Sequence, residues 1–396
     1  MTDKTVSLPE QRGHWGFIKN NLRDYGMLLS LFAIMLFFQF ATDGVLLQPV
    51  NLTNLVLQNS YIVIMAFGML LVIVTGNIDL SVGSVAGFVG AVGAMLMVRY
   101  HVGYPLAFIA CLLVGAAIGA AQGYWVAYFK IPAFIVTLAG MMVFRGLGFA
   151  LLDGQSIGPF PETFRNLSSG YIPELLPGAG TLHPTSLLIG AVLALGLIYF
   201  SAKGRAREQS HSIDVEPYAV FVAKNFLLSG LLFYSTYLMA SHNGLPNVLV
   251  ILMALIALYG FVTRRTVLGR QIYAVGGNAR AAKLSGVKTD RLTFLTFVNM
   301  GVLAALGGLV ITARLNSATP GAGTGFELDV IAACFIGGAS AYGGVGRVGG
   351  AVVGAMIMGV MNNGLSILGI GIDWQLVIKG FVLLGAVAVD VYNQRR

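Results

Sequence analysis

Charged residues are scarce in this sequence. Asp, Glu, Lys and Arg make up 10% of its 396 residues, whereas an average soluble domain contains about 25%. So few charges cannot cover the core of a water-soluble fold of this length. Disorder is excluded as well, because 57% of the residues are hydrophobic and disordered chains are poor in such residues. The composition predicts an all-α polytopic membrane protein, since a helix satisfies its own backbone in lipid.

Residues that bind metals or nucleotides are rare or wrongly spaced. Cys111 and Cys334 lie inside apolar runs and the five histidines show no ligand spacing, so we expect no metal site. The sequence has no Gly-Lys-Ser/Thr loop. We therefore expect no catalytic residues, no cofactor and no ATPase site in this chain. The Gly-x-Gly-x-x-Gly match at 344–349 separates two apolar runs and is not part of a βαβ unit, so it does not indicate a nucleotide site.

Apolar runs long enough to cross a bilayer recur throughout the chain. A hydrocarbon core of about 30 Å requires about 20 residues per helix, and by that measure we predict about twelve transmembrane helices within residues 25–391. They lie near 25–42, 53–75, 82–99, 104–128, 132–152, 184–201, 217–240, 246–263, 292–313, 326–343, 346–364 and 371–391. The short, glycine-rich span near 82–99 is expected to be broken. Glycine at every fourth position, at 115, 119 and 123 and at 346, 350 and 354, indicates close helix packing.

Basic residues are concentrated on one side of this topology. They lie in the N-terminal segment 1–24, the basic loop 202–216, the loop 264–291 and the tail 392–396. The positive-inside rule makes this side cytoplasmic, with both termini there and an external loop over 153–183 that carries a short surface helix. This asymmetry explains the net charge of +8 better than nucleic-acid binding does, so we expect no nucleic-acid partner.

The loop 264–291 contains the signal of a short capped helix. Asn278 can cap its start and Gly286 can end it in a left-handed turn. The basic residues share one edge, which leaves small apolar groups exposed. A solvated linker is the alternative, but a docking element for a soluble partner explains these features better. The residues assigned to it are Asn278, Arg280, Ala281, Ala282, Leu284, Ser285 and Gly286.

Polar residues inside or beside apolar runs are candidates for a translocation pathway. They are Gln58, Asn59, Asn77, Asp79, Ser81, Asn299, Asn362 and Asn363. Amide groups suit hydroxyl-rich solutes because they donate and accept hydrogen bonds, but they also join helices in lipid. Asp79 would cost about 2.5–3.5 kcal/mol at a helix centre, so it is either a cap of the third helix or part of a gate. Lys379 and Arg145 are expected to snorkel or to form pairs.

Several segments in combination resemble the permeases of monosaccharide ABC importers, above all the xylose or multiple-monosaccharide type. These segments are Gly76–Ser84, Pro132–Met141, Phe144–Gly146, Tyr273–Gly286, Ile336–Gly338 and Gly343–Gly346. The resemblance implies a ten-helix importer permease core, to which the stretch near 202–245 adds an extra helix pair. It also implies that 278–286 is the coupling helix.

The same resemblance implies partners and a location. The partners are a second copy of this chain, a cytoplasmic ATPase with two fused nucleotide-binding cassettes that uses the ATP, a periplasmic sugar-binding protein and the lipid of the bacterial inner membrane. The external loop 153–183 would then be periplasmic. An ion-coupled secondary sugar transporter is the main alternative, although Asp79 is the one intramembrane carboxylate that we single out for such coupling. A sugar-responsive membrane scaffold is a second alternative.

Overall fold

The computed structural model describes residues 22–176, 182–210 and 216–394. The predicted segment 1–24 therefore lies almost wholly outside the described residues, as do 177–181 of the external loop, 211–215 of the basic loop and 395–396 of the tail. Within the described ranges the chain is helical, and β-structure is limited to two isolated bridges. The predicted all-α fold is confirmed.

Ten of the described helical segments are long and apolar enough to cross a membrane. They are α3 (Pro49–Val74), α4 (Val82–Ala94) with the π-helical turn η1 (Met95–Arg99), α5 (Tyr104–Ala127), α6 (Ala133–Leu151), α8 (Pro184–Ser210), α9 (Tyr218–Ala240), α10 (Val248–Arg265), α13 (Thr289–Leu315), α15 (Val348–Ile367) and α16 (Ile372–Gln394). The remaining helices are α2 (Leu22–Ala41), α7 (Glu162–Arg165), α11 (Val267–Gly277), α12 (Ala279–Leu284) and α14 (Phe326–Ile336). The break expected near 82–99 does not occur, because α4 runs directly into η1 as one span over Val82–Arg99. Helix α7 is the expected short helix of the loop 153–183.

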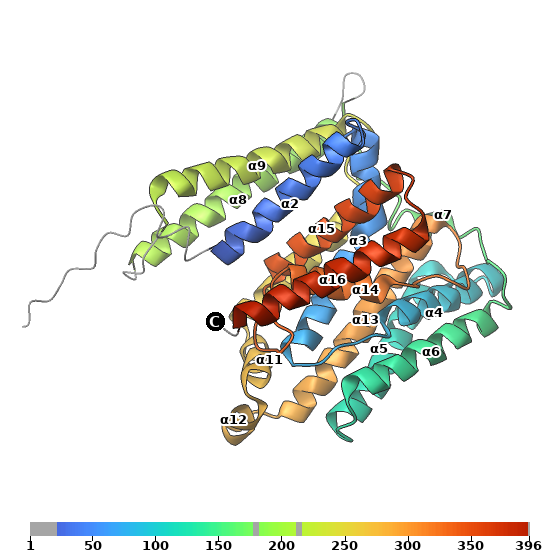
Figure 1. Cartoon of the computed structure of the whole chain (residues 1–396). Coiled ribbons are helices and arrows are strands. Elements are labelled where there is room, and N and C mark those ends of the chain that lie inside the picture. Colours follow the sequence, from blue (N-terminus) through green and yellow to red (C-terminus); the bar gives the residue numbers. More distant parts are fainter. Residues whose placement is uncertain (1–21, 177–181, 211–215, 395–396) are drawn as a thin grey trace, which may run out of the picture.

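Helix α3 forms the centre of the molecule. Its second half is apolar on all sides and the helix is buried along most of its length, as expected for a helix surrounded by others. Helices α13, α14, α15 and α10 pack around it, and α13 also contacts α4 and α5. Helices α8 and α9 form a hairpin beside this group, with α9 touching α3 (Figure 1). This hairpin overlaps the stretch 202–245, to which the resemblance assigns an extra helix pair.

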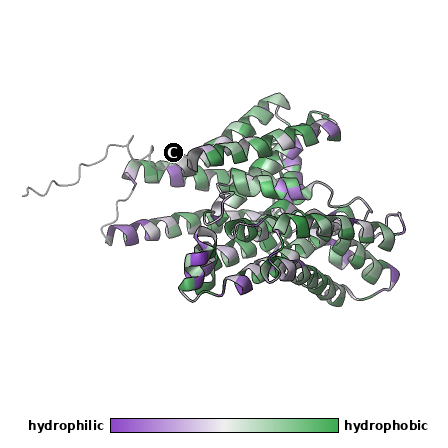
Figure 2. Cartoon of the chain, turned by 60° about the horizontal axis from the view of Figure 1, so that its bottom comes forward, coloured by the Kyte–Doolittle hydropathy of each residue, from purple (hydrophilic) through white to green (hydrophobic). Residues whose placement is uncertain are grey.

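Small residues allow the closest helix crossings, as the glycine spacing predicts. A Cβ atom at Gly119 would collide with the carbonyl oxygen of Phe297, so α5 and α13 approach at backbone distance. A Cβ atom at Gly350 would collide with the carbonyl oxygen of Gly337, which follows α14. Figure 2 shows the long helices as mostly hydrophobic, with hydrophilic residues gathered at their ends and in the connections.

The prediction of a full span over 326–343 was wrong. Helix α14 has 11 residues, which is about 16 Å of helix against a hydrocarbon core of about 30 Å. The apolar run continues, but the helix ends at Gly337 and Gly338, where Gly338 has a φ of +82°. Helix α14 is therefore a half-helix that packs against α3, α15 and α16.

Two predicted loops also contain more helix than expected. Residues 202–210 continue α8, because Ala, Arg, Glu and Gln are good helix formers. The segment 264–291 holds α11 and α12 and the start of α13. Helix α11 was not predicted, although Thr266 supplies a normal N-cap by accepting a hydrogen bond from the Gly269 amide at 3.1 Å.

Candidate functional site

A buried ion pair ties the half-helix α14 to its neighbours. The Asp329 carboxylate, with its side chain 2% exposed, lies 2.9 Å from the Lys379 ammonium of α16. It also accepts hydrogen bonds from the Tyr61 hydroxyl of α3 at 2.8 Å and from the Asn362 amide of α15 at 3.2 Å. An unpaired charge buried among membrane helices costs free energy. The cation and the two hydrogen-bond donors together offset that cost for Asp329.

A second acidic residue lies two positions earlier on α14. Glu327 of α14 is 9% exposed, and its carboxylate lies 3.9 Å from the Arg145 guanidinium of α6. The expectation that Lys379 and Arg145 form pairs is confirmed. The sequence analysis missed both carboxylates of α14, although their positions inside the apolar run 326–343 were a visible signal. Asp79 is therefore not the one intramembrane carboxylate to be considered for coupling.

Asp79 lies in the connection between α3 and α4 and is 3% exposed. Its Oδ1 accepts hydrogen bonds from the Ser81 amide at 2.8 Å and from the Ser81 hydroxyl at 2.7 Å. The Gln122 amide of α5 donates to the same hydroxyl at 2.9 Å. Asp79 thus closes a turn directly before α4, but the helix itself has no side-chain cap at its N-cap residue Ser81.

The amide side chains proposed for a pathway lie in separate places. Asn363 and Asn51 exchange hydrogen bonds of 2.9 and 3.1 Å between α15 and α3, and Asn299 of α13 accepts one from the Tyr259 hydroxyl of α10. These pairs join helices, as amides commonly do in lipid. Asn362 is the one predicted pathway residue that belongs to the Asp329 network.

The other predicted pathway residues make local contacts. Asn59 is buried and donates to the Leu55 carbonyl of its own helix at 2.9 Å. Asn77 is half-buried and donates to the Thr75 carbonyl at 3.2 Å, and Gln58 is half-buried on α3. The structure therefore does not bring the predicted set together at one site.

Helix α12 forms as the sequence predicts. The Asn278 side chain accepts a hydrogen bond from the Ala281 amide at 2.9 Å, and Gly286 has a φ of +85°. The Leu284 side chain is 85% exposed. Residues Arg280, Ala281 and Ser285 are exposed too.

The predicted exposure of Ala282 is wrong. This residue is 6% exposed and belongs to the buried core. Helix α12 rests against α11 and α13, so one of its faces must be covered, and Ala282 lies on that face. Leu284 is the large apolar side chain that α12 exposes, beside the smaller Ala281.

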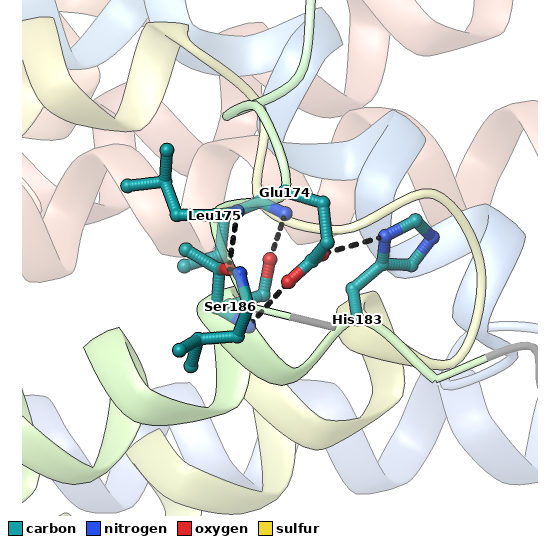
Figure 3. A network of polar contacts seen from close by, with 7 residues as sticks. Glu174, Leu175, His183 and Ser186 are labelled. Atoms are coloured by element: carbon teal, nitrogen blue, oxygen red, sulfur yellow. Dashed lines mark hydrogen bonds and ion pairs between the residues drawn. The ribbon is translucent and has the colours of Figure 1, made fainter. Parts of the chain in front are cut away.

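A polar cluster holds the external loop onto the start of α8 (Figure 3). The Glu174 carboxylate accepts a hydrogen bond from the Thr185 amide at 2.6 Å and lies 3.1 Å from Nδ1 of His183. The Thr185 hydroxyl in turn accepts from the Leu175 amide at 2.9 Å. These contacts, above all those from Thr185, hold the pKa of Glu174 below its ordinary value. An acidic group here also suits the positive end of α8.

Comparison with known proteins places the chain among membrane permeases. The family model described as branched-chain amino acid transport system / permease component matches residues 51–387. No solved structure matches the chain.

Curated relatives match along nearly the whole length. The xylose transport system permease protein XylH of Escherichia coli K12 is 38% identical over 392 residues, which cover 99% of this chain and 97% of that protein. XylH of Haemophilus influenzae is 38% identical over 376 residues, which cover 95% and 98%. The ribose import permease protein RbsC of Escherichia coli K12 is 34% identical over 395 residues, which cover all of both chains. The chain therefore belongs to the family of permease components of branched-chain amino acid transport systems, together with these xylose and ribose permeases.

Proposed function

We propose that the chain is the transmembrane permease subunit of an ATP-driven ABC importer that carries a monosaccharide across the bacterial inner membrane. The observation that carries this proposal is the full-length identity to xylose and ribose permeases. Xylose, or several pentoses and hexoses, are the substrates that this similarity favours. The chain is a transporter subunit rather than a catalytic one.

The energy for transport comes from a separate ATPase, since the sequence contains no Gly-Lys-Ser/Thr phosphate loop. Helix α12 is the docking element for that subunit. Its exposed Leu284 offers an apolar anchor, and its caps keep the helix formed outside the membrane. The face that carries α11 and α12 is cytoplasmic by the positive-inside rule, and residues 153–183 are periplasmic.

The complete importer contains two copies of this chain, an ATPase with two fused cassettes and a periplasmic binding protein that delivers the sugar. The surface of α16 supports a contact with a second copy or with lipid, because no residue of its membrane-spanning stretch is buried in the single chain. The binding protein supplies most of the sugar selectivity, which agrees with the scattered positions of the amide side chains.

Reconstitution into proteoliposomes tests this function. Sugar uptake is expected only when the ATPase, ATP and the binding protein are all supplied. Uptake driven by a proton or sodium gradient alone would show a secondary transporter instead. No uptake under either condition would favour a membrane scaffold that does not transport sugar. The pairing of Asp329 with Lys379 and of Glu327 with Arg145 argues against ion coupling, because both carboxylates already have cationic neighbours.

A further inference from the structure

A cavity of about 550 Å³ opens at the end of α10, on the face that carries α11 and α12. It is lined by Thr263, Arg264, Arg270, Tyr273, Gly346, Arg347 and Val348. Three of these residues are arginines and none is acidic. The proposed docking of α12 does not use this cavity, and neither does the Asp329 network.

Local structure brings these arginines to one place. Arg264 lies in the last turn of α10, and Arg270 lies in the first half of α11, which begins directly after the cap at Thr266. The Tyr273 hydroxyl of α11 donates a hydrogen bond to the Gly346 carbonyl at 2.7 Å. That bond ties α11 to the segment before α15 and so places Arg347, the residue at the start of α15, on the cavity wall.

The lining suits a phosphate group. Guanidinium groups bind phosphate through paired hydrogen bonds. Helix α15 begins at the cavity wall, where Arg347 and Val348 lie, and has no side-chain cap; the position of a Cβ atom at Gly349 is open space. A helix start with uncapped amides adds to the positive potential that the arginines create.

The position of the cavity favours a lipid as the source of that phosphate. Both α10 and α15 are membrane-spanning segments, and the cavity lies where one ends and the other begins, which is the depth of lipid headgroups. Phe261 lies about one turn before Arg264 on α10, and Leu258 lies about one turn before Phe261; their side chains are 60% and 53% exposed. These residues continue the site into the membrane as an apolar surface for an acyl chain.

We propose that Arg264 and Arg270, in the cavity whose wall Arg347 completes, form a binding site for the headgroup phosphate of an anionic phospholipid, whose acyl chain lies along Leu258 and Phe261 of α10. A bound lipid would hold α10, α11 and the start of α15 together. It would thereby restrain α11, against which α12 packs. This site is independent of the sugar that is carried, so its failure would leave the proposed function intact.

Native mass spectrometry of the full-length chain in detergent tests the proposal, with phosphatidylglycerol and phosphatidylcholine of identical acyl chains as probes. The wild-type chain should retain phosphatidylglycerol and not phosphatidylcholine. Each charge removed should weaken binding by about fivefold, so Arg264→Gln with Arg270→Gln should weaken it by roughly thirtyfold. Arg265→Gln is the matched control, because Arg265 is the neighbouring arginine on α10 and does not line the cavity.

Three results would overturn the assignment. Equal retention of both lipids, or wild-type retention by the double variant, would show that the arginines do not select a phosphate-bearing anionic lipid. Displacement of phosphatidylglycerol by an equal concentration of glycerol phosphate would assign the cavity to a soluble phosphorylated compound. Loss of ATPase co-purification in the double variant with unchanged lipid retention would assign it to the ATPase. Equal elution volumes of all variants on size exclusion would show that they are folded.

Discussion

Replacing Lys379 by Met should destabilise the membrane domain strongly, although Met is apolar and similar in size. The Lys379 ammonium lies 2.9 and 3.2 Å from the two oxygens of Asp329, and the side chains are 14% and 2% exposed. Removing the cation leaves a buried carboxylate without its opposite charge. Such a change costs about 3–5 kcal/mol. The hydrogen bonds from Tyr61 and Asn362 remain, so we expect a value near the lower end of that range.

A double-mutant cycle separates this explanation from a simple loss of packing. Asp329→Asn alone should also destabilise, because it leaves the Lys379 ammonium buried without its anion. The double variant Asp329→Asn with Lys379→Met should recover most of the loss, since neither residue then carries a charge that needs compensation. The free energy of unfolding of all four proteins can be measured by denaturant titration in mixed micelles.

Lys130→Met is the matched control for this cycle. Lys130 pairs with Asp290, but these side chains are 62% and 36% exposed, and an exposed pair contributes about 0–1 kcal/mol. The reasoning would be refuted if Lys379→Met cost no more than this control. It would equally be refuted if the double variant at 329 and 379 lost the sum of the two single effects.

Three further predictions concern helix α12, a helix crossing and the loop 153–183. Leu284→Asp should reduce co-purification of the ATPase without changing the melting temperature of the permease. Ala282→Trp should instead destabilise the permease itself by about 1–3 kcal/mol through overpacking. Unchanged ATPase binding in Leu284→Asp would place the contact elsewhere. Gly119→Ala should also cost about 1–3 kcal/mol, measured by denaturant titration, because of its collision with α13; a wild-type midpoint would contradict this. The pKa of Glu174 is lowered in the folded state. The ionised carboxylate therefore stabilises the fold at pH values above its pKa in the unfolded chain, about 4.3, and this stabilisation is lost as the pH falls through the lower pKa of the folded state. Protection of the Thr185 amide in hydrogen exchange should therefore fall over that range in the wild type and stay constant in Glu174→Gln.

Local signals in the sequence were sufficient for α12. Asn278 and Gly286 lie at its two ends, and each acts on backbone groups within three residues of itself, so no knowledge of the remaining fold was needed. Local signals could not predict which face of the helix is buried. The burial of Ala282 depends on where α11 and α13 pack, which is a property of the tertiary structure.

The half-helix α14 shows the limit of counting apolar residues. Hydropathy recorded a continuous run over 326–343, but the length of the helix was decided by the glycines at 337 and 338 and by the contact of Gly337 with α15. The network around Asp329 was equally hidden, because the hydrogen bond from Tyr61 joins residues 268 positions apart. What the sequence did contain was a pair of carboxylates in an apolar run, and these required a partner.

The shortness of α14 also determines the order in which the chain can be built. A segment of 11 residues is too short to leave the insertion machinery as an independent span, and its carboxylates each oppose insertion by about 2.5–3.5 kcal/mol. The compensating Lys379 is synthesised 50 positions after Asp329. Helix α14 can therefore reach its final, charge-compensated position beside α3 and α4 only after α16 has been synthesised. A chain interrupted before α16 would keep the Asp329 carboxylate without its cation.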